Sequence, residues 1–153
     1  MSEAPGEKRV IVTGGSRGLG RAIVITFARA GYRPFIIHRG DTAAAEATRA
    51  ALAASGREAT FLAADLAKEW PEHAAFKEKA AWVLVNNACP RFHPQPLHLI
   101  DPKEAAEGYA VMVGGALRGI EAMLKPMIQS GGGTIVNILS TVLVGPPPPG
   151  VAA

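Results

Sequence analysis

The chain is poor in several features that mark particular classes of protein. Its single cysteine, Cys89, excludes an internal disulfide and fits a reducing, cytoplasmic compartment. The first nine residues contain no apolar core, so we expect no secretory signal peptide. The most apolar long stretch, near residues 110–127, carries Arg118, Glu121 and Lys125 and is unsuited to crossing a bilayer. These absences predict a cytoplasmic protein with no membrane partner.

Aromatic residues and net charge are also low. Aromatic side chains make up 6% of the 153 residues, and the formal net charge is +3. The Lys and Arg residues are scattered along the chain, which is typical of a solvated, mildly basic surface. Nucleic-acid-binding surfaces gather basic residues, often beside aromatic ones. We therefore expect no nucleic-acid partner.

A glycine-rich turn follows an apolar strand near the start of the chain, at residues 9–20. The turn leads into a helix that begins near Leu19. Glycine permits close backbone approaches that a Cβ forbids, and a helix N-terminus presents unpaired N–H groups. After a strand, this combination forms a phosphate cradle, although many such turns are only structural. The spacing of Gly14, Gly18 and Gly20 is not that of a P-loop, and no Lys-Ser/Thr pair follows, which argues against an NTPase.

Strand-like apolar runs alternate with helical patterns, as in a parallel α/β sheet. Right-handed crossovers predict a doubly wound, Rossmann-type sheet with strand order 3-2-1-4-5. The expected strands cover residues 9–13, 34–38, 60–64, 82–86 and 134–139. The fifth strand is nearly all apolar but would lie at an edge, where proteins avoid long apolar strands. We expect more polypeptide or another subunit to pair with it.

Helix limits are marked by capping residues. Asp41 is a candidate N-cap for a helix from about Thr42, and Asp101 followed by Pro is another for a long helix. That long helix should end before Gly131, with its last turns kinked or trimmed by Pro126. A shorter helix is expected between residues 68 and 80.

Four short motifs occur one after another along the chain. They are T-G-x-x-x-G-x-G at residues 13–20, Asp65 after the third strand, Asn-Asn-Ala-Cys at 86–89 and Asn-Ile-Leu-Ser at 137–140. With them the chain resembles the short-chain dehydrogenase/reductase family over essentially its whole length. It is most similar to NADPH-dependent members such as the 3-oxoacyl-carrier-protein reductases. The resemblance implies one dinucleotide-binding domain over residues 1–153, incomplete at its C-terminus.

The resemblance also implies which residues bind the cofactor. The loop residues would surround the pyrophosphate, Asp65 and the backbone of Leu66 would meet the adenine, and Asn87 and Ala88 would line the nicotinamide ribose. The loop residues concerned are Gly14, Ser16, Arg17, Gly18, Leu19 and Gly20. Structural alternatives stay open, because Asp65 could simply cap the next helix and the asparagines could satisfy a buried turn.

The choice of cofactor follows from charge. Sites that prefer NAD hold the ribose 2′-hydroxyl with an acid about 20 residues past the glycines, whereas Arg accommodates a 2′-phosphate. Here the second strand ends in His38 and Arg39, with no acid before Asp41, and Arg17 lies in the glycine loop. Two guanidiniums can form charge-assisted contacts with a phosphate dianion. We therefore expect NADP(H); the alternative is that both arginines are merely solvated.

Ser140 matches the catalytic serine of the family, whose hydroxyl hydrogen-bonds the substrate oxygen. The family chemistry also needs a Tyr-x-x-x-Lys pair, in which Lys lowers the pKa of the Tyr general acid/base. Neither Tyr32 nor Tyr109 is followed by Lys four residues later, and we expect the pair in sequence beyond Ala153.

Other departures from the family pattern are smaller. Met112 stands where many relatives carry Asn, Cys89 replaces the last glycine of N-N-A-G and Leu139 replaces a serine, while the segment 65–86 is short. His93 and His98 have no Cys or acid at metal-ligand spacing, so no metal is expected.

The sequence thus favours an oxidoreductase that transfers hydride between NADP(H) and a small carbonyl or alcohol substrate. The alternative is a non-catalytic dinucleotide-binding sensor or partner subunit. The glycine-containing long helix could pack against a second subunit, as is usual in the family, and a homo-oligomer is expected.

Overall fold

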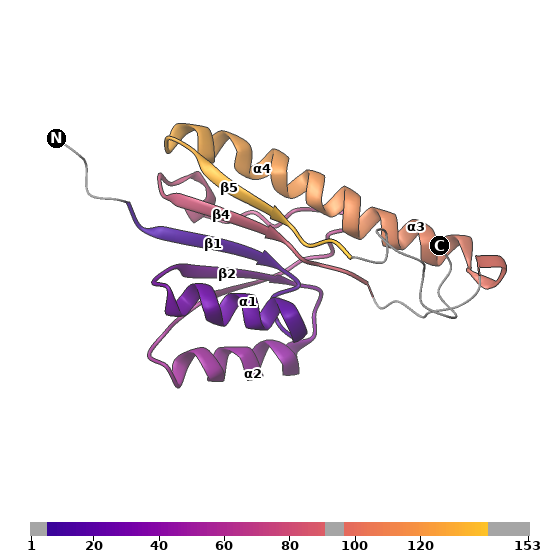
Figure 1. The fold of residues 1–153 in the computed structure, drawn as a ribbon, viewed down its shortest axis with the longest axis horizontal. Coiled ribbons are helices and arrows are strands. Elements are labelled where there is room, and N and C mark those ends of the chain that lie inside the picture. The colour runs from indigo at the N-terminus through magenta and orange to yellow at the C-terminus, as the bar shows by residue number, and fades with distance from the viewer. Residues whose placement is uncertain (1–5, 91–96, 141–153) are drawn as a thin grey trace.

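The computed structural model describes residues 6–90 and 97–140, which build a parallel sheet with the order β3-β2-β1-β4-β5 (Figure 1). This confirms the predicted fold class and strand order. The strands are β1 (Lys8–Thr13), β2 (Arg33–His38), β3 (Thr60–Ala63), β4 (Ala81–Asn86) and β5 (Gly133–Asn137). The α-helices are α1 (Gly18–Arg29), α2 (Thr42–Ala53), α3 (Pro102–Tyr109) and α4 (Gly115–Gln129).

Helices cover both faces of the sheet, with α1 and α2 on one side and α4 on the other (Figure 1). Successive strand residues point to opposite faces, so both faces carry an apolar layer. Val12 is fully buried in the same cluster as Val24 of α1 and Leu52 of α2. Its neighbour Ile11 belongs to the other cluster, with Met123 of α4. Burying each such side chain contributes about 1.5–3 kcal/mol, which makes the central strands the rigid support of the fold.

The predicted helix starts at residues 42 and 102 are confirmed. A side-chain oxygen of Asp41 accepts a hydrogen bond from the backbone N–H of Ala44 at 3.1 Å. Asp101 accepts one from Lys103 at 2.9 Å, and Pro102 occupies the first turn of α3. Each cap satisfies a donor that has no partner within its helix.

The prediction of a helix between residues 68 and 80 is wrong. The segment contains only a four-residue 3₁₀ helix, η1 (Ala74–Lys77). Pro71 disfavours the helical conformation at Trp70, and the ring of His73 accepts from the backbone N–H of Ala75 at 3.1 Å to start the short turn. The connection from β3 to β4 therefore packs on the sheet with little regular structure of its own.

The long helix differs from the prediction in two ways. A π-helical stretch, η3 (Ala110–Gly114), separates α3 from α4. Helix α4 also continues through Pro126 to Gln129, so Pro126 does not trim its last turn, whereas the predicted end before Gly131 is confirmed. Inserted π turns are frequent at functional sites, and this one adjoins the cavity described below.

β5 lies at the edge of the sheet, as expected, and pairs with β4 in the described part of the chain. Four of its five residues are exposed, and only Ile135 is partly buried. The proline-rich segment that follows lies outside the described residues.

Arg9, at the start of β1, forms hydrogen bonds and an ion pair with the irregular β3–β4 connection. Its guanidinium is buried and donates to the Ala75 carbonyl at 3.0 Å and to the Glu7 carboxylate at 2.8 Å. It also pairs with Glu78, which directly follows η1. Desolvation lowers the pKa of Arg9, but the hydrogen bonds to both carboxylates outweigh it and raise the pKa overall.

Arg9→Met should lower the free energy of unfolding by about 2 kcal/mol, because it removes a charged donor from a buried carbonyl and two carboxylates. Urea unfolding followed by circular dichroism measures this change. Lys68→Met is the control, since the ion pair of Lys68 with Asp65 is solvent-exposed and should be worth less than about 0.5 kcal/mol. Equal losses in the two variants would contradict a special role for Arg9.

Candidate functional site

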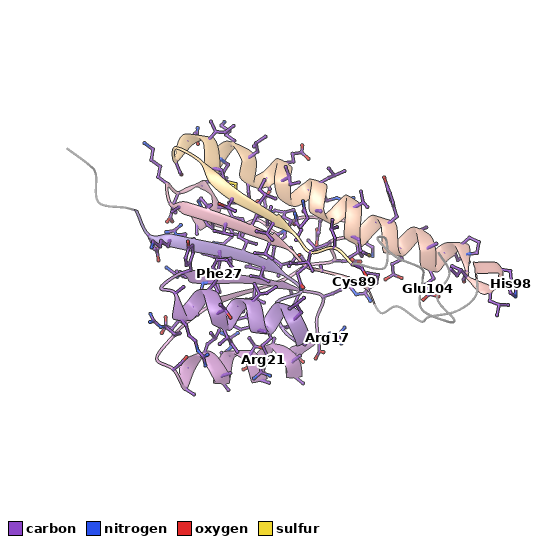
Figure 2. The ribbon with its side chains drawn as sticks, in the orientation of Figure 1. Arg17, Arg21, Phe27, Cys89, His98 and Glu104 are labelled. Carbon is purple, nitrogen blue, oxygen red and sulfur yellow. The ribbon has the colours of Figure 1, made fainter. Side chains whose placement is uncertain are left out.

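A cavity of about 840 Å³ opens at the carboxyl ends of the strands, where open α/β sheets bind ligands. Figure 2 shows Arg17, Cys89 and Glu104 on the side of the molecule toward which these strand ends point. All eleven residues predicted to bind a cofactor line the cavity. They are Gly14, Ser16, Arg17, Gly18, Leu19, Gly20, Arg39, Asp65, Leu66, Asn87 and Ala88. The fold therefore gathers four separate segments of the chain, at residues 14–20, 39, 65–66 and 87–88, around one space.

The glycines of the loop are required by its geometry. Gly14 and Gly18 have φ angles of +67° and +53°, which L side chains rarely adopt. A Cβ on Gly20 would lie 2.2 Å from the carbonyl oxygen of Gly14 and 2.6 Å from the side-chain nitrogen of Asn87. Helix α1 can start this close to the end of β1 only because Gly20 has no side chain.

The loop is held from two sides. The backbone N–H of Gly14 donates to the Ile37 carbonyl of β2 at 2.8 Å, and the hydroxyl of Thr48 on α2 donates to the Ser16 carbonyl at 2.7 Å. Ser16 and Thr48 are both buried. The first turn of α1 contains no acidic residue, and its N-cap, Arg17, makes no side-chain cap. The helix start therefore keeps backbone donors for an anion.

Thr13 joins the ends of β1 and β4. Its hydroxyl oxygen accepts from the backbone N–H groups of Asn87 and Ala88, each at 2.9 Å. The side-chain amide of Asn87 donates back to the Thr13 carbonyl at 2.9 Å. Thr13 belongs to the glycine motif, but its role could not be predicted from the sequence, because only the sheet brings residues 74 positions apart together.

Asp65 and Asn86 also take part in local structure. A carboxylate oxygen of Asp65 accepts from the backbone N–H of Ala67 at 3.2 Å, so Asp65 makes a turn and lines the cavity as well. The side chain of Asn86 donates to that of Asn137 at 2.9 Å, which ties β4 to β5. Leu66 packs against α4, because a Cβ on Gly115 would lie 3.0 Å from its side chain.

The two arginines of the cavity have acidic partners. Nη1 of Arg17 lies 3.9 Å from a carboxylate oxygen of Asp41, and Arg39 donates to Glu107 of α3. The hydrogen bond to Glu107 raises the pKa of Arg39 above its usual value. Both arginine side chains are more than half exposed and accessible from the cavity. Sequence reasoning missed Glu107, since nothing in its spacing indicates a partner 68 residues away.

Ser140 is exposed and lies three residues beyond β5; it is not among the described residues that line the cavity. Cys89 does line it, and the Cys89 thiol lies 3.8 Å from the sulfur of Met112 in the π-helical stretch. Two departures from the family pattern thus contact each other at the rim of the site. His98 lies in the short helix η2 (Leu97–Leu99), and His93 is outside the described residues.

Two searches of the described residues gave negative results. No group of three or more His, Cys, Asp or Glu side chains there could hold a metal ion. None of the described helices has both the length and the apolar character needed to span a bilayer.

Comparison with known proteins gives relatives over most of the chain. An uncharacterised oxidoreductase of Mycobacterium tuberculosis is 37% identical over 145 residues, which is 89% of this chain and 53% of that protein. The chain spans about half the length of the curated relatives it matches.

Solved structures with similar folds contain NADP. A metagenomic short-chain oxidoreductase in complex with NADP has a TM-score of 0.73 and 32% identity, covering 87% of this chain and 62% of that one. A 3-oxoacyl (acyl-carrier-protein) reductase from Agrobacterium tumefaciens with NADP bound has a TM-score of 0.72 and 27% identity, covering 87% and 52%. The family model described as short chain dehydrogenase matches residues 8–151. The chain therefore belongs to the short chain dehydrogenase family of oxidoreductases.

Proposed function

We propose that the chain binds NADP(H) and serves hydride transfer between the nicotinamide and a small carbonyl or alcohol substrate. The observation that carries this proposal is the cavity at the carboxyl ends of the strands, which has a glycine cradle and two accessible arginines. The NADP bound to the two solved relatives supports the same choice of cofactor. In this proposal residues 1–153 belong to one dinucleotide-binding domain.

The cavity is chemically suited to a dinucleotide with a 2′-phosphate. The close approach of Gly20 to Gly14 places the start of α1 at the cavity, where its backbone N–H groups could bind a pyrophosphate. Arg17 and Arg39 would bind the 2′-phosphate, because guanidiniums form strong charge-assisted hydrogen bonds with phosphate. Asp65 and the backbone of Leu66 would hold the adenine at the end of β3.

The reactive end of the cofactor would lie near β4. Asn87 and Ala88 would line the nicotinamide ribose, held by their hydrogen bonds with Thr13. The bound nicotinamide supplies the hydride donor or acceptor, whereas the protein positions the reactants. Ser140 would orient the substrate by hydrogen-bonding its carbonyl or alcohol oxygen, and the Tyr-x-x-x-Lys pair of the family is not among the 153 residues.

Met112 favours the second candidate, a non-catalytic dinucleotide-binding protein. The side chain of Met112 replaces an amide in the π-helical stretch, and its sulfur contacts Cys89. A thioether cannot donate a hydrogen bond, so Met112 cannot hold a water molecule as an asparagine would. Turnover of NADPH with a carbonyl substrate separates the two candidates: oxidation supports the enzyme, and binding without oxidation supports the sensor.

Arg39→Asp should shift cofactor preference from NADPH to NADH by at least about tenfold, because a carboxylate repels the 2′-phosphate and accepts from a 2′-hydroxyl. Titration calorimetry with both cofactors measures the ratio of dissociation constants. Arg29→Asp is the control, since it makes the same charge change at the last residue of α1, which does not line the cavity. An unchanged ratio in Arg39→Asp would defeat the assignment of the 2′-phosphate site.

Gly20→Ala should weaken NADPH binding at least tenfold and lower the free energy of unfolding by about 3 kcal/mol, because the new methyl group meets a backbone carbonyl. Gly108→Ala is the matched control. A Cβ at Gly108 meets nothing within 4 Å, so this helical substitution should be neutral or stabilise by up to about 1 kcal/mol. Full NADPH affinity in a folded Gly20→Ala variant would show that the loop is not the binding site.

We also propose that the protein forms a homo-oligomer through one face of η3 and α4. Val113, Leu117, Leu124 and Ile128 recur at helical spacing on this face and are all at least 40% exposed. Monomeric proteins rarely leave such a continuous apolar stripe in water.

Leu117→Glu should lower the molar mass measured by light scattering after gel filtration, because it puts a charge in the centre of the apolar stripe. Leu99→Glu is the control: Leu99 is as exposed as Leu117, at 60%, but lies in η2 outside the stripe. A monomeric mass for the unaltered protein, or the same mass for both variants, would contradict the proposed interface.

A further inference from the structure

The contact between Arg39 and Glu107 joins two parts of the chain that are distant in sequence. Arg39 directly follows β2, and Glu107 lies on α3, 68 residues later. The Glu107 carboxylate accepts from a terminal nitrogen of the Arg39 guanidinium, and both residues line the cavity. The Arg39–Glu107 pair is thus part of the wall that faces a ligand.

The surroundings of the pair are rich in carboxylates. Asp41, Asp65, Glu104 and Glu107 all line the cavity, against Arg17 and Arg39 as its arginines. Glu107 supplies the largest contribution to the raised pKa of Arg39, and Asp65 adds a smaller one. Arg39 is therefore already engaged by a carboxylate in the structure without ligand.

We infer that Glu107 is a specificity-determining residue that competes with the 2′-phosphate of NADPH for the guanidinium of Arg39. The inference rests on the proposed function, because it requires a 2′-phosphate to bind at Arg39. Glu107 acts through Arg39: it occupies a donor that the phosphate would use, and it moderates the preference for NADPH over NADH.

The exposure of the pair makes exchange of partners feasible. The Arg39 side chain is 60% exposed and that of Glu107 is 48% exposed, so the pair is weakened by solvent. A phosphate dianion carries more charge and more acceptor oxygens than a carboxylate and can displace it. NADH lacks the 2′-phosphate and has no such competition to overcome, so Glu107 weakens the binding of NADPH selectively.

Removing the carboxylate tests the inference. Glu107→Gln should tighten NADPH binding about three- to tenfold, since Arg39 no longer has an anionic partner. NADH affinity should stay within about twofold, because no 2′-phosphate is involved. Glu46→Gln is the matched control: Glu46 pairs with Arg49 on α2, at a distance of 3.4 Å, but does not line the cavity. Calorimetric titration with NADPH and NADH at fixed ionic strength measures both constants.

A second background shows whether Glu107 acts through Arg39. In Arg39→Gln, adding Glu107→Gln should change the NADPH dissociation constant by less than about twofold, because the competed donor is already gone. A full three- to tenfold gain there would mean direct repulsion of the phosphate and would overturn the inference. Circular dichroism of each variant checks that the fold is intact.

The remaining outcomes are also decisive. Unchanged or weaker NADPH binding in Glu107→Gln, with tight binding by the unaltered protein, overturns the competition and leaves the proposed function standing. If the unaltered protein binds neither cofactor, the proposed function fails and this inference fails with it.

Discussion

The contact between Gly20 and the carbonyl of Gly14 is the constraint on which the site depends. Because neither residue has a side chain, α1 begins directly against the end of β1, and a Cβ at residue 20 would lie 2.2 Å from a backbone oxygen. The pairing of β1 with β4 brings Asn87 within reach of Thr13, so that the ends of the two strands are bonded to each other. The cavity is what remains between these fixed ends, and its backbone donors need no rearrangement to bind an anion.

The charged side chains around this cavity would determine which ligand it binds best. The two arginines supply the cationic side expected for a 2′-phosphate, but Arg17 lies 3.9 Å from Asp41 and Arg39 is bonded to Glu107. Binding of the proposed NADPH would therefore exchange these protein carboxylates for the phosphate oxygens of the ligand. The affinity of such a site would depend on the difference in free energy between the arginine–phosphate and the arginine–carboxylate ion pairs. Acidic residues outside the recognised motifs would therefore control it.

Several features depart from the expected pattern, each for its own physical reason. The short β3–β4 connection is held by Arg9 instead of a full helix, because Pro71 interrupts the segment. Cys89 and Met112 replace small and polar residues and bring two sulfur atoms within 3.8 Å. The edge strand β5 and the apolar face of α4 both leave apolar side chains exposed, and the proposed oligomer would cover the face of α4.

Through the resemblance of its motifs to a known family, the sequence predicted eleven of the residues that line the cavity. By itself it determined the strand order and the N-caps Asp41 and Asp101. These features follow from local rules: apolar periodicity, glycine spacing and short capping motifs act over a few residues. It did not determine the 3₁₀ turn at 74–77, the π-helical stretch at 110–114 or the bonds of Thr13, because these depend on how segments pack. The tertiary structure alone decided that Glu107 meets Arg39, since a contact across 68 residues exists only once the sheet brings β2 close to α3.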